Sequence, residues 1–319
     1  MNTEVTYMGL PLRSPIVLTQ AIPDAELLLP MEETGIGAVV LRPLLEEEII
    51  WDIKLNQREV APVSNYGTNL EYVAQHMPKD YVKRYIDQVA ELKKRLSIPV
   101  IASIDCYRFD AWFSHIQMLA DAGCDAIEID IQLQPYNPEV TNDEVERLFS
   151  DITSIYNRIT ARPLSLKMGR HYTDMVNFMQ RLMWMGVKNV TLFNTTPTID
   201  IDLQQMQLTQ SDKEASEEDA LFWTAIIRNH VGFNLSTVVH NGEGAVKALL
   251  LGATTAHISH RNGQTDAAAM QKAVDTLRDW MQQHDKDNIH AFLGSLIPTN
   301  MRKNYHTIRE HYIQSMKNT

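Results

Sequence analysis

The sequence predicts an α/β fold in which parallel strands alternate with helices along almost the whole chain. Short runs rich in β-branched residues recur, and amphipathic stretches at 80–96, 110–123 and 173–186 separate several of them. A glycine stands just before four of these runs, where a helix has to end in a left-handed residue. These glycines are Gly35, Gly123, Gly186 and Gly252. Helix, glycine and strand in repeated order are typical of parallel βαβ units.

The number of strands decides between the two common parallel architectures. Strands are expected, in order, at 15–19, 37–41, 99–104, 125–131, 163–168, 189–194, 234–239 and 254–259. Eight such units close into a barrel more readily than they remain an open sheet. A doubly wound sheet would carry a glycine-rich loop after its first strand, and residues 17–26 contain no glycine. The sequence therefore favours a (β/α)8 TIM barrel.

Four segments lie outside the repeated unit. The start, "EVTYMGLPLRSP", predicts a small β-hairpin that plugs the bottom of the barrel. Long excursions at 44–79 and 195–217 follow strands two and six, and both leave from the face where barrel enzymes keep their chemistry. Long loops in that position are usually lids or oligomer contacts. A helical extension is expected at 284–319, and 1–319 is expected to form a single domain.

Composition excludes several classes of function. The chain has 319 residues, 44% of them hydrophobic, and a formal net charge of −11. An acidic surface argues against nucleic acid and anionic membranes as partners. No apolar run approaches the ~20 residues that span a bilayer, and no signal peptide precedes "MNTEVTYMGL". With only two cysteines, these features predict a cytoplasmic protein.

Polar residues occupy one phase of several strands. In 125–131 the isoleucines take one phase, while Glu128 and Asp130 take the other. The inward-facing polar set near the strand ends is Arg42, Ser103, Asp105, Glu128, Asp130, Ser165, Lys167 and Asn194. Buried charges persist only when they are paired, so Lys167 is expected to pair with Glu128 or Asp130. The cluster is either a structural ion pair or a ligand site, and its position favours a ligand.

A metal centre and a nucleophile elbow are not expected. His240, His257 and His260 lie near the ends of strands seven and eight. Two of them, His257 and His260, are three residues apart and would face opposite sides of a strand. No carboxylate is placed as a bridging ligand, and no Gly-x-Ser-x-Gly motif is present.

The strand ends, taken together, resemble a known family. "SPIVLTQA", "IPVIASI", "GCDAIEIDI", "PLSLKMG", "VTLFNT" and "GEGAVKALLLGA" resemble, in this order, the dihydroorotate dehydrogenase family of FMN barrels over about residues 5–283. "GAVVLRPLLEEEI" and "LFNTTPTIDIDL" resemble its dihydroorotate dehydrogenase-like branch. The resemblance implies an oxidoreductase of pyrimidine metabolism in which hydride passes from a carbon–carbon single bond to FMN N5. It also implies a homodimer and a small-molecule substrate.

The resemblance further implies roles for individual residues. Residues Thr19–Ala21 would contact the edge of the flavin ring. Lys167 would stabilise negative charge near flavin N1 and O2. The flavin phosphate would lie near residues 240–244 and 257–260. The implied cofactor-binding set is Thr19, Gln20, Ala21, Arg42, Lys167, His240, Gly242, Gly244, His257, Ser259 and His260. The implied substrate-binding set is Asn65, Asp105, Asp130, Asn194 and Thr195.

The chain departs from the family at both ends of the cofactor site. Val238–Val239 stands where the family has a glycine pair that lets backbone N–H groups reach phosphate. "HISH" stands where the family has glycines at the end of strand eight. After strand two, "LRP" stands where the family has a flavin-contacting lysine, and Arg42 is the residue that could replace this lysine. Asp105 and Asp130 stand where the family has asparagines. An aspartate roughly 4 Å from a substrate carboxylate costs about 4 kcal/mol at an effective dielectric of 20.

The family's proton acceptor is also missing. Gln132, Leu133 and Gln134 occupy the region after strand four where the family has a cysteine or serine, and none of them accepts a proton near neutral pH. Tyr136 or Asn65–Tyr66 are the stand-ins that the sequence offers.

Three hypotheses remain open at this point. The first is an FMN oxidoreductase of this family, and the second is a barrel that has lost its flavin and binds another ligand or a partner protein. The third is an anion site built from side chains, namely Arg42, His240, His257 and His260.

Overall fold

The predicted barrel is present in the computed structural model. It describes residues 1–56, 72–73, 75–106, 112–132, 140–194, 199–210, 216–259, 266–297, 309–310 and 312–317. The barrel strands are β3 (Ile16–Ala21), β4 (Ala38–Leu41), β6 (Val100–Cys106), β7 (Ala126–Ile131), β8 (Leu164–Met168), β9 (Asn189–Leu192), β12 (Asn234–Val239) and β13 (Thr255–Ser259). Every neighbouring pair is parallel, and the pairing of β4 with β6 closes the ring. Each strand lies within a few residues of its predicted position.

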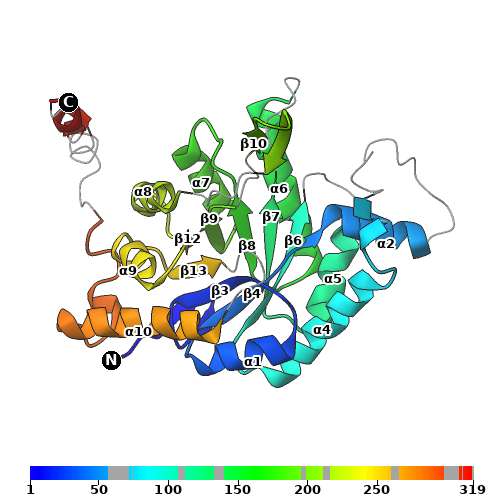
Figure 1. Ribbon diagram of the computed structural model, residues 1–319, viewed down its shortest axis with the longest axis horizontal. Coiled ribbons are helices and arrows are strands. Elements are labelled where there is room, and N and C mark those ends of the chain that lie inside the picture. Colours follow the sequence, from blue (N-terminus) through cyan, green and yellow to red (C-terminus); the bar gives the residue numbers. More distant parts are fainter. Residues whose placement is uncertain are drawn as a thin grey trace.

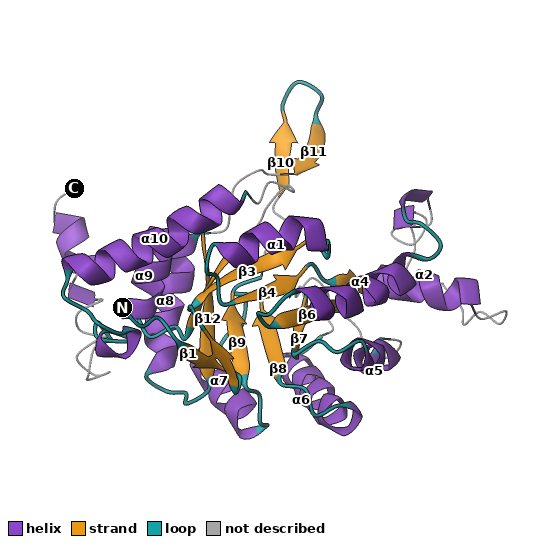
Figure 2. Ribbon diagram, turned by 90° about the horizontal axis from the view of Figure 1, so that it is seen from below, coloured by secondary structure: helices purple, strands orange, loops and turns teal. Residues whose placement is uncertain are grey.

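Helices surround the strands (Figures 1 and 2). They are α1 (Ala25–Glu33), α4 (Tyr81–Arg95), α5 (Phe113–Asp121), α6 (Asn142–Ile159), α7 (Met175–Trp184), α8 (Glu217–Arg228), α9 (Gly242–Leu250) and α10 (Ala267–Gln283). The four glycines that precede strands have φ of 91°, 93°, 90° and 92°, so each is the left-handed residue that ends a helix. The isoleucines of β7 are fully buried, as expected for the strand face that packs under helices.

The N-terminal hairpin closes one end of the barrel. Strands β1 (Val5–Tyr7) and β2 (Leu10–Leu12) pair antiparallel, which confirms the predicted hairpin. Tyr7 is fully buried, and its hydroxyl accepts hydrogen bonds from Asn189 Nδ2 at 3.2 Å and Ser236 Oγ at 3.3 Å. Because both donors lie early in barrel strands, the hairpin fills the barrel at the end opposite to the strand C-termini.

The two excursions contain structure of their own. After β4 the chain forms β5 (Leu44–Leu45), which pairs with β6, and then helix α2 (Glu46–Asn56). After β9 an antiparallel hairpin, β10 (Ile199–Asp202) and β11 (Gln207–Gln210), projects from the body of the protein (Figure 2). Leu203 and Met206 at its tip are exposed.

After α10, the chain runs back alongside the N-terminal segment. The 3₁₀ helix η2 (Ile289–Ala291) lies beside it, because Asn288 forms a parallel bridge with Asn2. Within the described part of 284–319, residues 309–310 and 312–317 are also helical. A search of the described helices finds none that combines the length and the apolar character needed to cross a bilayer.

Replacement of Gly37 by alanine is expected to destabilise the barrel. The Gly37 N–H donates to Ile16 O at 2.8 Å, and a Cβ at this position would overlap the Ser14 carbonyl oxygen and lie 3.2 Å from Leu12 Cβ. Gly37→Ala should lower the free energy of unfolding by about 1–3 kcal/mol, because overpacking forces the backbone apart. Urea unfolding measures the change. Gly232→Ala is the control, since the atom nearest to its Cβ would be Met183 Sδ at 3.9 Å. Equal losses in both variants would contradict the close approach at Gly37.

Candidate functional site

The polar residues predicted to face inward share the inner surface of the barrel. Strand register aligns Asp105 with Asp130, Asp130 with Lys167, and Lys167 with Thr191. Residues at one level of neighbouring parallel strands point to the same face of the sheet. Glu128, Asp130 and Lys167 are 1%, 3% and 3% exposed. This level lies toward the C-terminal ends of the strands, where barrel enzymes build their active sites.

A hydrogen-bonded layer supports the cluster from below. Glu128 Oε2 accepts hydrogen bonds from Thr191 Oγ1 at 2.7 Å and Ser165 Oγ at 3.1 Å. Asn189 Nδ2 donates to Ser165 Oγ at 2.9 Å, and its Oδ1 accepts from Ser236 Oγ at 3.1 Å. Burial raises the pKa of Glu128, and the charge of Lys167 opposes that rise. The lower half of the barrel is thus a connected polar network, which holds the strands in one arrangement.

Lys167 and Asp130 form the ion pair at the centre of the site. Lys167 Nζ lies 3.5 Å from Asp130 Oδ2. The other carboxylate oxygen, Oδ1, accepts from Asn194 Nδ2 and from Gln132 Nε2, each at 3.1 Å. Burial lowers the pKa of Lys167, but Asp130 and Glu128 outweigh this effect and leave the pKa raised. The ammonium group therefore remains charged at neutral pH.

Asp105 adds a second carboxyl group at the level of Asp130. Burial raises the pKa of Asp105 well above its ordinary value, and the negative charges of Asp130 and Glu47 raise it further. Asp105, Glu128 and Asp130 are three carboxyl groups that surround one lysine. Because one cation cannot neutralise three carboxylates, the cluster favours bound protons or a ligand that brings hydrogen-bond donors or positive charge.

Within the described part of the chain, eight buried side-chain N or O atoms have no hydrogen-bond partner, and three of these belong to residues of the predicted site. The three are Thr19 Oγ1 on β3, His257 Nδ1 on β13 and Asn194 Oδ1 just after β9, and their residues are each 1% exposed or less. An unsatisfied buried polar atom costs about 1–3 kcal/mol, so native proteins rarely leave one without a purpose. Burial, with a smaller effect of Lys167, lowers the pKa of His257 to about 3, so its imidazole is neutral. The three atoms are candidates for ligand contacts.

The end of β3 is shaped by a bulge. The pairing of β3 with β4 shifts register between Leu18 and Ala21, and Gln20 has a φ of 59°. Bulges at barrel rims re-aim side chains next to active sites. Gln20 Oε1 accepts a hydrogen bond from Ser259 Oγ at 2.7 Å, which joins the rims of β3 and β13. Ala21 pairs with Leu41, whose phase faces the helices, whereas Thr19 faces the interior.

Arg42 does not offer an unpaired positive charge to a ligand, and Cys106 does not offer a thiolate. Arg42 Nη2 lies 2.6 Å from Glu48 Oε1, and its guanidinium stands over the Tyr81 ring at 5.1 Å. The cation expected to replace a flavin-contacting lysine is therefore paired with α2 and packed on α4. Cys106 lies in the phase opposite to Asp105, and burial raises its pKa well above the ordinary value. Its thiol stays protonated at neutral pH and cannot act as a base.

The turn after β12 differs from a phosphate cradle. Val238 and Val239 end the strand, with Val238 half-buried in the inward phase. A Cβ on Gly242 would lie 2.9 Å from Ala273 O in α10, so this glycine serves helix packing. Asn241 caps α9 by accepting from the Gly244 N–H at 3.1 Å, and the His240 N–H donates to Glu217 Oε2 at 2.7 Å. These residues do not fit a flavin phosphate.

Some predicted residues lie outside the described part of the chain, and one important residue was not predicted. Asn65, Thr195 and His260 lie outside the described residues, as do Tyr66 and Tyr136, which were expected to stand in for the proton acceptor, and Leu133 and Gln134. Sequence reasoning missed Glu217, because three acidic residues after Ser216 indicate only the start of a helix. No group of His, Cys, Asp and Glu able to hold a metal occurs among the residues that are described.

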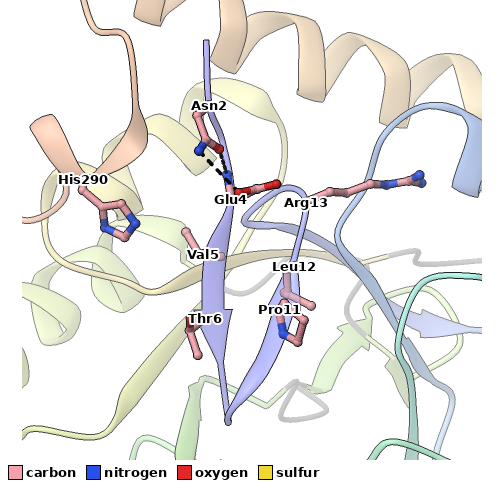
Figure 3. A pocket seen from close by; sticks show the side chains of 8 residues that line it. All are labelled: Asn2, Glu4, Val5, Thr6, Pro11, Leu12, Arg13 and His290. Atoms are coloured by element: carbon pink, nitrogen blue, oxygen red, sulfur yellow. Dashed lines mark hydrogen bonds between the residues drawn. The ribbon is translucent and has the colours of Figure 1, made fainter.

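A separate pocket lies at the other end of the barrel. It has a volume of about 490 Å³ and is lined by the N-terminal hairpin, Asn2, Arg13 and His290 (Figure 3). Arg13 Nε donates to Ile36 O at 2.9 Å, and Asn2 Oδ1 accepts from the Glu4 N–H at 2.8 Å. The N-terminal face of such barrels serves stability, so this pocket is not part of the site.

Comparison with known proteins points to the same family as the strand-end motifs. No family model matches the chain. The catalytic subunit of dihydroorotate dehydrogenase B (NAD(+)) from Alkaliphilus oremlandii (strain OhILAs) is 22% identical over 270 residues, which cover 82% of this chain and 87% of that protein. This distant similarity spans most of the barrel and supports an oxidoreductase of the dihydroorotate dehydrogenase family.

Loss of the buried lysine is expected to destabilise the protein in a pH-dependent way. Lys167→Met should lower the free energy of unfolding by about 3–5 kcal/mol at pH 8, because it leaves buried carboxylates without a cation. The pKa values of Asp130 and Glu128 are raised in the folded state, so their protonated forms favour folding and this contribution is lost as pH rises. The loss should therefore shrink toward pH 5, as measured by urea unfolding at several pH values.

The control for this variant is Lys83→Met. Lys83 and its partner Asp87 are both exposed, so little change is expected at any pH. A loss in Lys167→Met that matches the control, or that does not vary with pH, would contradict a buried charge cluster.

Proposed function

We propose that this chain is an oxidoreductase of the dihydroorotate dehydrogenase family that acts on a small molecule bound at the mouth of the barrel. The observation that carries this proposal is the charged, buried Lys167 paired with Asp130 at 3.5 Å, on the barrel face that also holds unsatisfied polar atoms. A purely structural ion pair would not need unpartnered groups around it. The distant similarity to a dihydroorotate dehydrogenase supports the reaction class.

The redox group of such a reaction is a flavin, which accepts a hydride from the substrate when it is bound. The residues for the flavin ring fit this group. Lys167 supplies a permanent positive charge for the negative charge of the reduced ring. Thr19 Oγ1, Asn194 Oδ1 and Nδ1 of the neutral His257 have no partner among the described residues and would bond a polar, uncharged ring edge. The phosphate end does not fit, so the proposal concerns the ring site alone.

The charge of the site selects the class of substrate. Asp105 and Asp130 lie at one level of the mouth, and Glu47 of α2 adds negative potential at Asp105. A substrate carboxylate would be repelled, by about 4 kcal/mol for each ionised aspartate at roughly 4 Å. The proposed substrate is therefore uncharged or cationic, and dihydroorotate itself is disfavoured.

Asp105 is the proposed proton acceptor. Its raised pKa brings proton uptake closer to neutral pH, where a general base works best. The competing groups are unsuitable, because the Cys106 thiol stays protonated and the Gln132 amide donates to Asp130. Asp105 also lies beside the Lys167–Asp130 pair, so a base and a cation flank one ligand position.

A barrel without flavin is the second candidate function. The carboxylate of Glu217 at the turn after β12 and the inward Val238 support it, since both lie in the region where the resemblance puts the phosphate. The third hypothesis, an anion site made of side chains, loses support. Arg42 is neutralised by Glu48, and the low pKa of His257 leaves that imidazole uncharged.

Flavin uptake by the purified protein tests the proposal. Incubation with riboflavin or FMN, followed by gel filtration, should leave a visible flavin absorption band with the protein. Anaerobic addition of uncharged or cationic donors should bleach that band, whereas dihydroorotate should not. A protein that retains neither flavin would overturn the oxidoreductase proposal and favour the second candidate.

Asp105→Asn is expected to slow flavin reduction about 10²-fold or more, because general-base catalysis contributes about 10²–10⁴. The base acts in its ionised form, so the wild-type rate should rise as pH passes through its pKa, and this rise should be absent in the variant. Stopped-flow absorbance measures the rate. Asp121→Asn removes an exposed carboxylate on α5 and should leave the rate unchanged. A pH-dependent rate that survives in Asp105→Asn would refute the assignment.

A further inference from the structure

A carboxylate from one helix occupies the first turn of the next helix. Glu217 is the first residue of α8, and its side chain is 13% exposed. Its Oε2 accepts the N–H of His240 at 2.7 Å, in the turn that leads from β12 into α9. A Cβ built on Gly244 would lie 2.5 Å from Glu217 Oε2 and 2.8 Å from Cδ. The carboxylate therefore fills the space that a side chain at Gly244 would take.

This position is one where a barrel of this kind can hold an anion. Backbone N–H groups and the positive end of the helix dipole attract negative charge at a helix N-terminus. In TIM barrels the loops after strands seven and eight frequently bind phosphate in this way. Here the His240 N–H already has Glu217 as its acceptor, and the Gly244 N–H has the side chain of Asn241. The His240 imidazole also faces the carboxylate, with Nδ1 at 3.7 Å from Oε2.

Helix capping does not explain why Glu217 points across to α9. The N-terminus of α8 has its own cap, because the side chain of Ser216 accepts from the Asp219 N–H at 3.2 Å. Glu218 and Asp219 already place negative charge in that first turn. A carboxylate that served α8 alone would stay over its own N–H groups. Glu217 instead crosses to the turn after β12, where it accepts the His240 N–H.

From this geometry we infer that Glu217 is a built-in substitute for the phosphate of a ligand. A bound phosphate would meet both the bulk and the negative charge of this carboxylate, so the barrel mouth takes a ligand without a phosphate group at this end. For the flavin class of ligand, which rests on the proposed function, the preference is for riboflavin over FMN. Three features carry the inference: a filled space, an occupied N–H donor and a valine in the inward phase.

Inorganic phosphate tests the role of Glu217 without any flavin. Glu217→Ala empties the position and frees the His240 N–H, so phosphate affinity should rise at least tenfold over the wild type. Affinity is obtained from the dependence of the melting temperature on phosphate, against chloride at equal ionic strength. Glu243→Ala is the matched control, because Glu243 is an exposed acid in the same first turn of α9 and fills no cavity. The control should gain less than twofold.

Each outcome of the phosphate experiment either supports or overturns the inference. A gain confined to Glu217→Ala supports the inference, and Glu217→Gln, which keeps the bulk, should gain less than the alanine variant. Phosphate binding to the wild type with the affinity of Glu217→Ala would overturn the inference, and so would equal gains in Glu217→Ala and Glu243→Ala. If Glu217→Ala gains no phosphate affinity while its circular dichroism and melting temperature in chloride match the wild type, the position is not an anion site and the inference fails.

Flavin titration adds a second and independent readout. The wild type should bind riboflavin at least tenfold more tightly than FMN, measured by quenching of flavin fluorescence, and Glu217→Ala should reduce or reverse that ratio. Tighter binding of FMN than of riboflavin by the wild type would contradict the inference while leaving the proposed function intact. Binding of neither flavin would overturn the proposed function, and the phosphate experiment would still decide the role of Glu217.

Discussion

The site depends on one buried charge, the Lys167 ammonium, and on the closed ring of strands that keeps water away from it. A lysine that is 3% exposed persists as a cation only because Asp130 and Glu128 compensate for its lost hydration. Glu128 is held in turn by threonine and serine side chains that fill the barrel below, and Asp130 by Asn194 just after β9. The polar interior is therefore one connected unit, and its upper surface is the place where a ligand would meet a fixed positive charge.

The two ends of the expected cofactor site differ in the groups that they offer to a ligand. At the ring end, the charged lysine lies among polar atoms on β3, on β13 and after β9 that have no partner among the described residues. At the phosphate end, a carboxylate of the chain itself is bound to the backbone of the turn. Carboxyl groups are also present in the proposed substrate region, where Asp130 pairs with Lys167 and Asp105 lies at the same level. Carboxyl groups thus lie both beside Lys167 and at the turn after β12, and for this reason the proposed ligand carries less negative charge than FMN or dihydroorotate.

Much of the fold was predictable because its signals are local. Periods of two and 3.6 residues, and a glycine before each of four strands, depend only on neighbouring residues, so the eight strands were found within a few residues of their positions. The Lys167–Asp130 pair was foreseeable too, since strand alternation places both residues inside a closed barrel. Glu217 was not predictable, because it meets Gly244 only when α8 and α9 pack side by side. Arg42 was predicted to face a ligand, yet its partner Glu48 becomes available only through the placement of α2.

By itself, the sequence determined the order of the elements, the phase of each strand and the excess of carboxyl groups over lysine in the interior. It did so because these properties follow from residue type and spacing along the chain. Only the tertiary structure decided which charges meet, which polar atoms remain without partners and which anion occupies the N-terminus of α9. Such contacts join residues from separate helices and strands, and their distances are set by how the helices pack around the ring.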